Sequence, residues 1–117
     1  TLEAAEAFAA LMDGLTPHDP DVKLVVSGGL NRPPYEKSQA IAALFERAQG
    51  FARDIGFELH DLTTGGCSDG NFTAPLTTTL DGLGVDGRGG HTNYEQLYIS
   101  SLEPREALLY QLIRHAV

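Results

Sequence analysis

Two consecutive prolines, Pro33 and Pro34, divide the chain into a short first part and a longer second part. Proline donates no backbone hydrogen bond and fixes its own φ, so this stretch must be extended and without ladder donors. Before it lie one amphipathic pattern, over residues 2–15, and one strand pattern, over residues 22–26. A single strand leaves both of its edges unpaired. We therefore expect a boundary near residues 31–38, and a partner for the first part from further sequence or another copy.

Apolar periodicity predicts three longer helices. The clearest covers about residues 37–55, where apolar residues form a continuous stripe and Gly56 is well placed as the C-cap. Residues 2–15 show the same spacing and are ended by Gly14. The last helix has Pro104 in its first turn, a position that proline tolerates. Its expected buried face is formed by Leu108, Leu109, Leu112, Ile113 and Ala116.

Shorter elements are expected between the second and third of these helices. Alternating or β-branched residues predict strands over residues 57–60, 77–80 and 97–99. A short helix is predicted to open at Ser68 or Asp69 and to continue through Leu76. Five glycines follow in a loop over residues 81–93, which is long enough to suggest a function. This order of helices and strands is typical of an α/β layer.

Composition excludes several classes of function. Sixteen acidic residues against eight basic ones give a formal charge of −8, and such a surface repels phosphate backbones, so we expect no nucleic-acid partner. No apolar run reaches the length of a membrane-spanning helix, so we expect no membrane partner. Cys67 is the single cysteine and forms no internal disulfide. The compartment stays open between cytoplasm and periplasm.

The residues that suggest chemistry lie in two glycine-rich segments. Residues 65–70 read Gly-Gly-Cys-Ser-Asp-Gly at the start of the short helix, and His91 follows Gly89 and Gly90. Free N–H groups at a helix start favour carboxylate or phosphate. A neutral imidazole is a good zinc ligand, and neighbouring glycines let the backbone approach a metal closely. A catalytic zinc takes about three protein ligands, so the sequence supplies only part of such a site.

Each of these features also has a plainer interpretation. A lone histidine in a sequence is more often a surface or structural residue. The glycine turn also fits a tight connection in which Ser68 or Asp69 caps the helix. Arg32, beside the prolines, is equally well a solvated side chain. No histidine stands at a motif spacing from Cys67, which argues against a nucleophilic thiol. No Lys-Ser/Thr follows the glycines, so the turn is not a P-loop.

The order of these motifs resembles a known family. Residues 64–70, 82–84 and 90–91, then residues 95–102 ending in Ile-Ser-Ser-Leu before a closing helix, are similar to the C-terminal part of the zinc-dependent aminoacylase/carboxypeptidase family. That family includes glutamate carboxypeptidase, acetylornithine deacetylase and succinyl-diaminopimelate desuccinylase. Residues 22–34 resemble the last strand of the family's inserted lid domain and its return to the catalytic domain. The resemblance runs through nearly the whole chain.

The resemblance implies an α/β fold in two parts. Residues 1–34 would be the last helix and strand of an α+β lid and dimerisation domain, so we expect a homodimer. Residues 35–117 would be the C-terminal part of a zinc-exopeptidase-like α/β sandwich. The complete enzyme would hold two zinc ions and cleave a peptide or N-acyl amino acid amide bond. No His-Xaa-Asp motif or adjacent glutamate pair occurs here. We therefore expect the base and most metal ligands in a missing N-terminal part, and no activity from this chain alone.

The resemblance also assigns roles to individual residues. His91 would bind one zinc ion. Arg32 would hold the free carboxylate of the substrate, a task that suits the fork-shaped guanidinium. Gly65, Gly66 and Cys67 would contact the substrate backbone near the scissile amide. No catalytic acid or base is expected within this chain. The alternative hypothesis is a self-standing, non-catalytic domain that binds a small carboxylate at the glycine turn or associates with itself.

Overall fold

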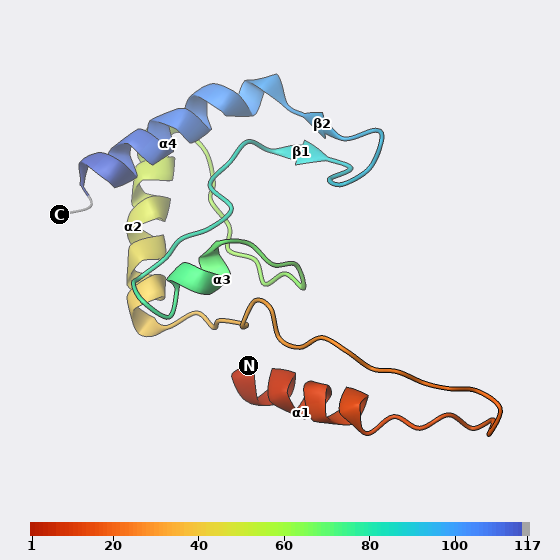
Figure 1. The fold of residues 1–117 in the computed structure, drawn as a ribbon. Coiled ribbons are helices and arrows are strands. Elements are labelled where there is room, and N and C mark those ends of the chain that lie inside the picture. Colours follow the sequence, from red (N-terminus) through yellow and green to blue (C-terminus); the bar gives the residue numbers. More distant parts are fainter. Residues whose placement is uncertain (116–117) are drawn as a thin grey trace.

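The computed structural model describes residues 1–115 (Figure 1). Ala116, expected on the buried face of the last helix, lies outside these described residues. The elements follow one another as α1 (Leu2–Asp13), α2 (Gln39–Ile55), α3 (Gly70–Thr73), β1 (Gly87–Arg88), β2 (Gln96–Leu97), the 3-10 helix η1 (Ile99–Ser101) and α4 (Leu102–Arg114). No helix among these residues is both long enough and apolar enough to cross a membrane.

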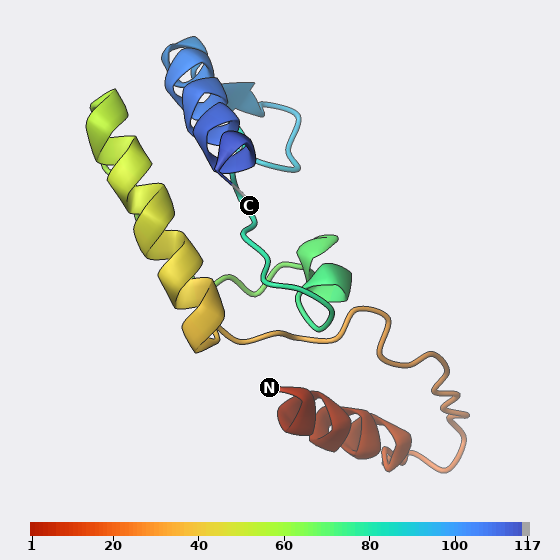
Figure 2. The ribbon, with the colours of Figure 1, turned by 90° about the vertical axis from the view of Figure 1, so that its left-hand side faces the viewer.

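Helices α2 and α4 pack against each other and enclose the core. The C-terminal half of α2 lies beside α4 in both views (Figure 1 and Figure 2). Four residues of the two helices form one buried cluster: Ala48, Ala52, Leu108 and Leu112. The alanines on α2 are small enough to let the leucines of α4 approach its backbone. The core is therefore narrow and follows a single line of contact between two helices.

Local signals fix both ends of α2, and the predicted C-cap at Gly56 is confirmed. The Ser38 hydroxyl accepts a hydrogen bond from the N–H of Ile41, which satisfies a donor of the first turn. Gly56 adopts a left-handed conformation with φ of 106°, and its N–H donates to the carbonyls of Ala52 and Arg53. Glycine adopts this conformation without steric cost, so the helix ends there.

The predicted buried face of α4 is only partly correct. Leu108 and Leu112 are buried as expected, but Leu109 is 43 % exposed and Ile113 is 66 % exposed. The reason is that, within residues 1–115, α2 covers α4 from one side only. A single covering helix buries one i, i+4 row, and burial of the wider stripe would need a second neighbour.

Helix α1 has no core of its own. The Thr1 hydroxyl accepts from the N–H of Ala4 and caps the helix, which then ends at Asp13, two residues before the predicted end. None of its residues is buried, and Phe8 and Leu11 are both more than half exposed. Both views place α1 away from the α2–α4 pair, beyond α3 and the proline segment (Figure 1 and Figure 2).

Three of the four predicted strands do not form in the described residues. Residues 22–26, 57–60 and 77–80 have no strand conformation there. A strand requires a neighbour that completes its hydrogen-bond ladder, and these segments have none within the described chain. Residues 22–26 are also exposed throughout. The α/β sandwich therefore stays a prediction.

The remaining short elements form close to their predicted positions. The expected strand over residues 97–99 is observed as β2 and ends at Leu97, because the chain then turns into η1. β2 pairs antiparallel with β1, with Gly87 opposite Leu97 and Arg88 opposite Gln96. β1 lies inside the predicted loop over residues 81–93. The helix predicted through Leu76 is shorter and stops at Thr73.

The chain is far more extended than a compact domain of its length. Its radius of gyration is 19.4 Å, whereas a compact domain of 117 residues has about 13 Å. Its accessible surface is 9359 Å², whereas a folded monomer of 12.5 kDa exposes roughly 6,200 Å². The excess of roughly 3,000 Å² on this one chain is larger than the area of about 800 Å² that each partner contributes to a standard-sized interface. Much of it is apolar, since Val25, Leu62, Leu76 and Ile99 are all strongly exposed.

Candidate functional site

A groove with a volume of about 920 Å³ lies between the N-terminal half of α1, the proline segment and the glycine turn. Its lining includes Arg32 together with Gly65, Gly66 and Cys67. The structure thus brings together four of the five residues that the sequence singled out. The fifth, His91, does not line this groove.

Side-chain hydrogen bonds shape the glycine turn. The N–H of Ser68 donates to Oδ1 of Asn71 at 2.8 Å, and the N–H of Gly70 donates to Oγ of Ser68 at 3.0 Å. The Ser68 hydroxyl donates in turn to the carboxylate of Asp81. Of the two capping residues that the sequence allowed, Asp69 stands at the N-cap of α3 but makes no capping bond, while the Ser68 hydroxyl accepts from the N–H of Gly70, the first residue of the helix. The turn is therefore held by Asn71 within α3 and by Asp81, which lies beyond this helix.

Gly70 is required by this arrangement of polar groups. A Cβ atom at this position would lie 3.1 Å from Oγ of Ser68 and 3.2 Å from Oδ2 of Asp81. Any side chain would therefore push apart the serine and the aspartate that hold the turn.

The backbone amides of residues 65–67 in the turn have no hydrogen-bond partner within the described chain. A Cβ atom at Gly65 would meet no atom within 4 Å. Among the described residues, the N–H groups of Gly65, Gly66 and Cys67 donate to no protein acceptor. These amides are therefore available to an acceptor oxygen of a ligand.

Arg32 lies directly against the glycine turn. Its Nη1 donates to Oδ1 of Asp69 at 3.0 Å, and its guanidinium carbon lies 5.1 Å from the ring centre of Phe72. Asn71 fastens the neighbouring backbone, because its Nδ2 donates to the carbonyl of Pro33 at 2.9 Å. The proline segment is thus bound to the turn by an ion pair with Asp69, a cation–π contact with Phe72 and a hydrogen bond from Asn71.

A second ion pair, unlike that of Arg32 with Asp69, lines the groove with both of its side chains. The Lys37 ammonium donates to the carboxylate of Asp61, and both residues border the groove. The hydrogen bond from Lys37, with the charge of the same group, lowers the pKa of the Asp61 carboxyl below its ordinary value. The groove therefore carries two cations, each already paired with an aspartate of this chain.

Sequence reasoning missed Lys37 and Asn71 as residues that line the groove, and Phe72 as the ring beneath Arg32. The contacts of Arg32 with Asp69 and of Lys37 with Asp61 span 37 and 24 positions, which no local pattern reveals. The Asn71 contact with Ser68 spans three positions. An asparagine three residues after a turn serine can bond back to the backbone, and that signal was present in the sequence.

His91 lies elsewhere, on the connection between β1 and β2. Its own φ is 64°, and Gly89 on the same connection has φ of 69°. A Cβ atom at residue 89 would lie 2.8 Å from the Tyr94 ring, so glycine is required there. The N–H of His91 donates to Oε2 of Glu95 at 3.3 Å, which fastens the two ends of the connection. The residue is exposed.

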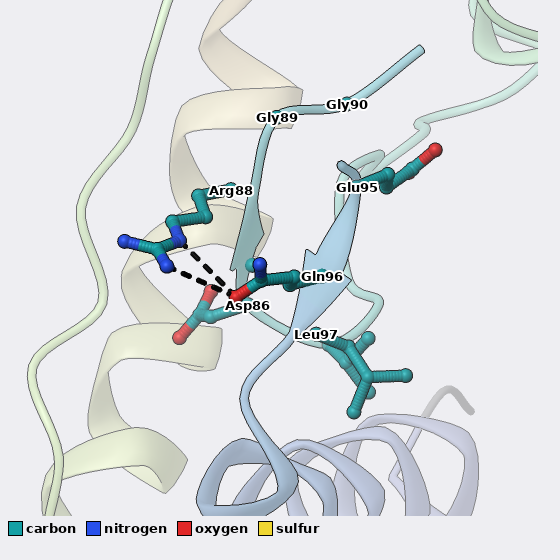
Figure 3. A pocket seen from close by; sticks show the side chains of 9 residues that line it. Asp86, Arg88, Gly89, Gly90, Glu95, Gln96 and Leu97 are labelled. Atoms are coloured by element: carbon teal, nitrogen blue, oxygen red, sulfur yellow. Dashed lines mark hydrogen bonds between the residues drawn. The ribbon is translucent and has the colours of Figure 1, made fainter. Parts of the chain in front are cut away.

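A shallow pocket borders this connection (Figure 3). Its lining includes Asp86, Arg88, Glu95 and Gln96. Nε and Nη2 of Arg88 both donate to Oε1 of Gln96, at 3.3 and 3.1 Å. The close-up shows this pair turned toward Asp86 and away from Glu95. Arg88 is thus bound to the opposite strand.

The His91 side chain fits the role of one metal ligand. An exposed imidazole on a loop shaped by glycines is accessible to an ion. Residues 1–115 contain no group of three His, Cys, Asp or Glu side chains that could hold a metal. A catalytic zinc takes about three protein ligands, so any such site would need groups from beyond these residues.

Comparisons of this chain with protein-family models, with curated proteins and with solved structures found no match.

Proposed function

We propose that this chain is the C-terminal part of a zinc-dependent hydrolase that cleaves a peptide or N-acyl amino acid amide bond. The observation that carries the proposal is the groove, in which Arg32 meets the glycine turn. Arg32 and Asp69 stand 37 positions apart, so the tertiary fold is what joins them. The resemblance assigns substrate contacts to both Arg32 and the glycine turn. Their meeting in one groove therefore supports a common substrate-binding site.

The groove offers two kinds of donor to an N-acylated amino acid. The guanidinium of Arg32 binds the free carboxylate, since its planar fork matches the two carboxylate oxygens. The amides of Gly65, Gly66 and Cys67 bind oxygens of the amide that is cleaved. These two sets of donors orient the substrate. Because the chain carries a net negative charge, Arg32 is one of few positions that attract a carboxylate.

His91 holds one of two zinc ions in this proposal. When bound, zinc supplies Lewis-acid chemistry toward an amide carbonyl. The remaining ligands and the glutamate base belong to the N-terminal part of the catalytic domain. Because His91 does not line the groove, the rest of the polypeptide must complete the site between them.

The experiment uses the complete polypeptide that contains this chain. It is purified with zinc and assayed against a panel of N-acetyl amino acids and dipeptides. We expect hydrolysis, and a loss in His91→Ala of at least about 100-fold in kcat/KM, since loss of even an outer-shell partner of a metal costs 10–100-fold. His18→Ala is the control, because His18 lies exposed in a turn away from the groove.

Two outcomes would contradict the proposal. One is the absence of any amidase activity in the complete polypeptide with zinc. The other is activity that does not depend on His91. Binding of small carboxylates without hydrolysis would instead favour a self-standing carboxylate-binding domain.

We also propose a homodimer in which residues 22–26 pair with the same segment of a second copy. Val25 is 71 % exposed, and the segment has no neighbouring strand within the described chain. Val25→Lys should raise the dissociation constant measured by sedimentation equilibrium. Leu76→Lys is the control, since Leu76 is also strongly exposed, at 85 %, but lies after α3. A strictly monomeric wild type at high concentration, with residues 22–26 ordered, would refute this pairing.

A further inference from the structure

The Arg32 guanidinium is already occupied by a carboxylate of its own chain. Nη1 of Arg32 lies 3.0 Å from Oδ1 of Asp69, and this is a single contact. The Arg32 side chain is 32 % exposed, whereas the Asp69 side chain is 92 % exposed. The cation is thus partly enclosed, and its partner stands almost entirely in solvent. A guanidinium has five N–H donors, so this single contact leaves the other donors free for further acceptor oxygens.

Other contacts hold Arg32 in place without Asp69. The guanidinium lies over the Phe72 ring at 5.1 Å, a distance suited to a cation–π interaction. The backbone next to Arg32 is fixed by Asn71, which is 8 % exposed and bonds both the Pro33 carbonyl and the Ser68 amide. Removal of the Asp69 charge therefore leaves the arginine where it is.

The carboxylate of Asp69 and the carboxylate of a ligand differ in how tightly they bind Arg32. An exposed pair with one contact is weak, because water screens it and side-chain ordering opposes it. A carboxylate that engages the guanidinium with both oxygens forms a stronger, charge-assisted pair. A ligand whose amide oxygen also meets the free amides of the turn gains further contacts that Asp69 does not make.

We propose that Asp69, which contacts Arg32 from outside the lining of the groove, is an intramolecular competitor that occupies this guanidinium while the groove is empty and is displaced by the carboxylate of the ligand. This inference rests on the proposed carboxylate-binding role of Arg32. Asp69 then lowers the affinity for every carboxylate by a constant factor. Ligands that offer only a weak anion fail to displace it, while N-acyl amino acids, which contact the turn as well, succeed.

The test measures binding to the complete polypeptide by calorimetry. N-Acetylglycine is the probe, and N-acetylglycinamide, which lacks the charge, is its neutral counterpart. Asp69→Asn keeps the size of the side chain and removes the competing charge. We expect it to tighten N-acetylglycine binding by up to about fivefold, the upper limit for an exposed ion pair worth about 1 kcal/mol. Binding of N-acetylglycinamide should not change.

Two further variants separate a local effect from a general one. Asp54→Asn makes the same change in net charge on an exposed residue of α2 and should leave both affinities unchanged. In an Arg32→Gln background, Asp69→Asn should no longer alter N-acetylglycine binding, because the competition needs the cation. In the hydrolysis assay, Asp69→Asn should lower KM for N-acyl amino acids.

The outcomes distinguish this inference from the proposed function. Weaker or unchanged N-acetylglycine binding in Asp69→Asn would overturn the inference, even if hydrolysis depends on His91. If the complete polypeptide shows no hydrolysis, the hydrolase proposal fails. The comparison of N-acetylglycine binding still tests the role of Asp69 in that case. Unchanged N-acetylglycine binding in Arg32→Gln would overturn both the role of Arg32 and that of Asp69.

Discussion

Helices α1 and α2 have the same kind of amphipathic sequence, yet they differ completely in burial. α2 buries Ile41, Ala48 and Ala52, and two of these contact α4. α1 buries nothing, although Phe8 and Leu11 fall at the same helical spacing. The difference is that α4 supplies α2 with a partner, whereas no other helix among residues 1–115 packs on α1. Periodicity thus predicts that a helix forms, but the partner that buries it must be found elsewhere.

The groove lies where these two regions meet. Phe8 of α1 lines one part of it, and Ile41 at the start of α2 lines another. The contacts of Arg32, Asn71 and Phe72 hold the intervening proline segment against the turn. The groove is therefore held by side-chain contacts on the side of the packed region. On the side of α1 it is bordered by a helix with no buried residue.

The largest expected effect comes from the packed region. Leu108→Ala removes a side chain with no exposed surface and should destabilise the chain by about 2–5 kcal/mol, through lost burial and a cavity. Leu109→Ala, at an exposed neighbour on the same helix, should cost much less. Urea unfolding followed by circular dichroism measures both. An equal loss of stability in the two variants would mean that α2 does not cover the Leu108 side of α4 as described.

The two glycines of α2 should respond in opposite directions. Gly56→Ala forces a left-handed residue with φ of 106° and should cost about 1 kcal/mol. Gly50→Ala lies within the helix, where a Cβ atom meets nothing within 4 Å, and should stabilise by about 0.5–1 kcal/mol. The two thermal midpoints relative to wild type provide the measurement. A shared direction would contradict the assigned end of α2.

A substitution on α1 sharpens the comparison directly. Leu11→Gln should change the stability of this chain by no more than about 0.5 kcal/mol, since the side chain is already mostly exposed. In the complete polypeptide, or in a dimer that covers α1, the same change should cost clearly more. Unfolding of both forms in urea would show this. A large cost in the chain alone would refute the description of α1 as uncovered.

The smallest effect concerns pH and the ion pair in the groove. The Lys37 contact holds the folded-state pKa of Asp61 below its ordinary value of 3.8, so this pair stabilises the fold above that pH. The contribution is lost as pH falls through the lowered folded-state pKa. The difference in urea midpoint between wild type and Lys37→Met should therefore be present at pH 6 and shrink below pH 3.8.

Lys23→Met is the matched control for this prediction. It makes the same change in charge at a residue that forms no ion pair within the described chain. A pH-dependent difference of equal size in Lys23→Met would assign the effect to net charge rather than to the pair.

Sequence alone predicts those features that depend on near neighbours. The end of α2 at Gly56 was predicted and follows from contacts over three or four residues, and the Ser38 cap at its start, which was not singled out, is equally local. The exposure of Leu109 and Ile113 could not be predicted, because it depends on how many elements cover α4. The strand expected at residues 22–26 failed to form for the same reason, since its partner is not local.

The candidate site shows the same limit. Arg32 and the glycine turn were singled out separately, and their meeting in one groove depends on contacts over long sequence distances. Either Ser68 or Asp69 was expected to cap the short helix, yet Asp69 at the N-cap makes no capping bond and pairs with Arg32 instead. His91 was identified by its glycine-rich surroundings, and residues 1–115 do not bring it to the groove.

The zinc content of the complete polypeptide tests the central claim most directly. We expect two zinc ions for each chain by elemental analysis after dialysis, a lower content in His91→Ala, and the wild-type content in His18→Ala. Those results would identify His91 as a ligand that this chain contributes to a shared metal site. An unchanged zinc content in His91→Ala, or no zinc in the wild type, would contradict the account.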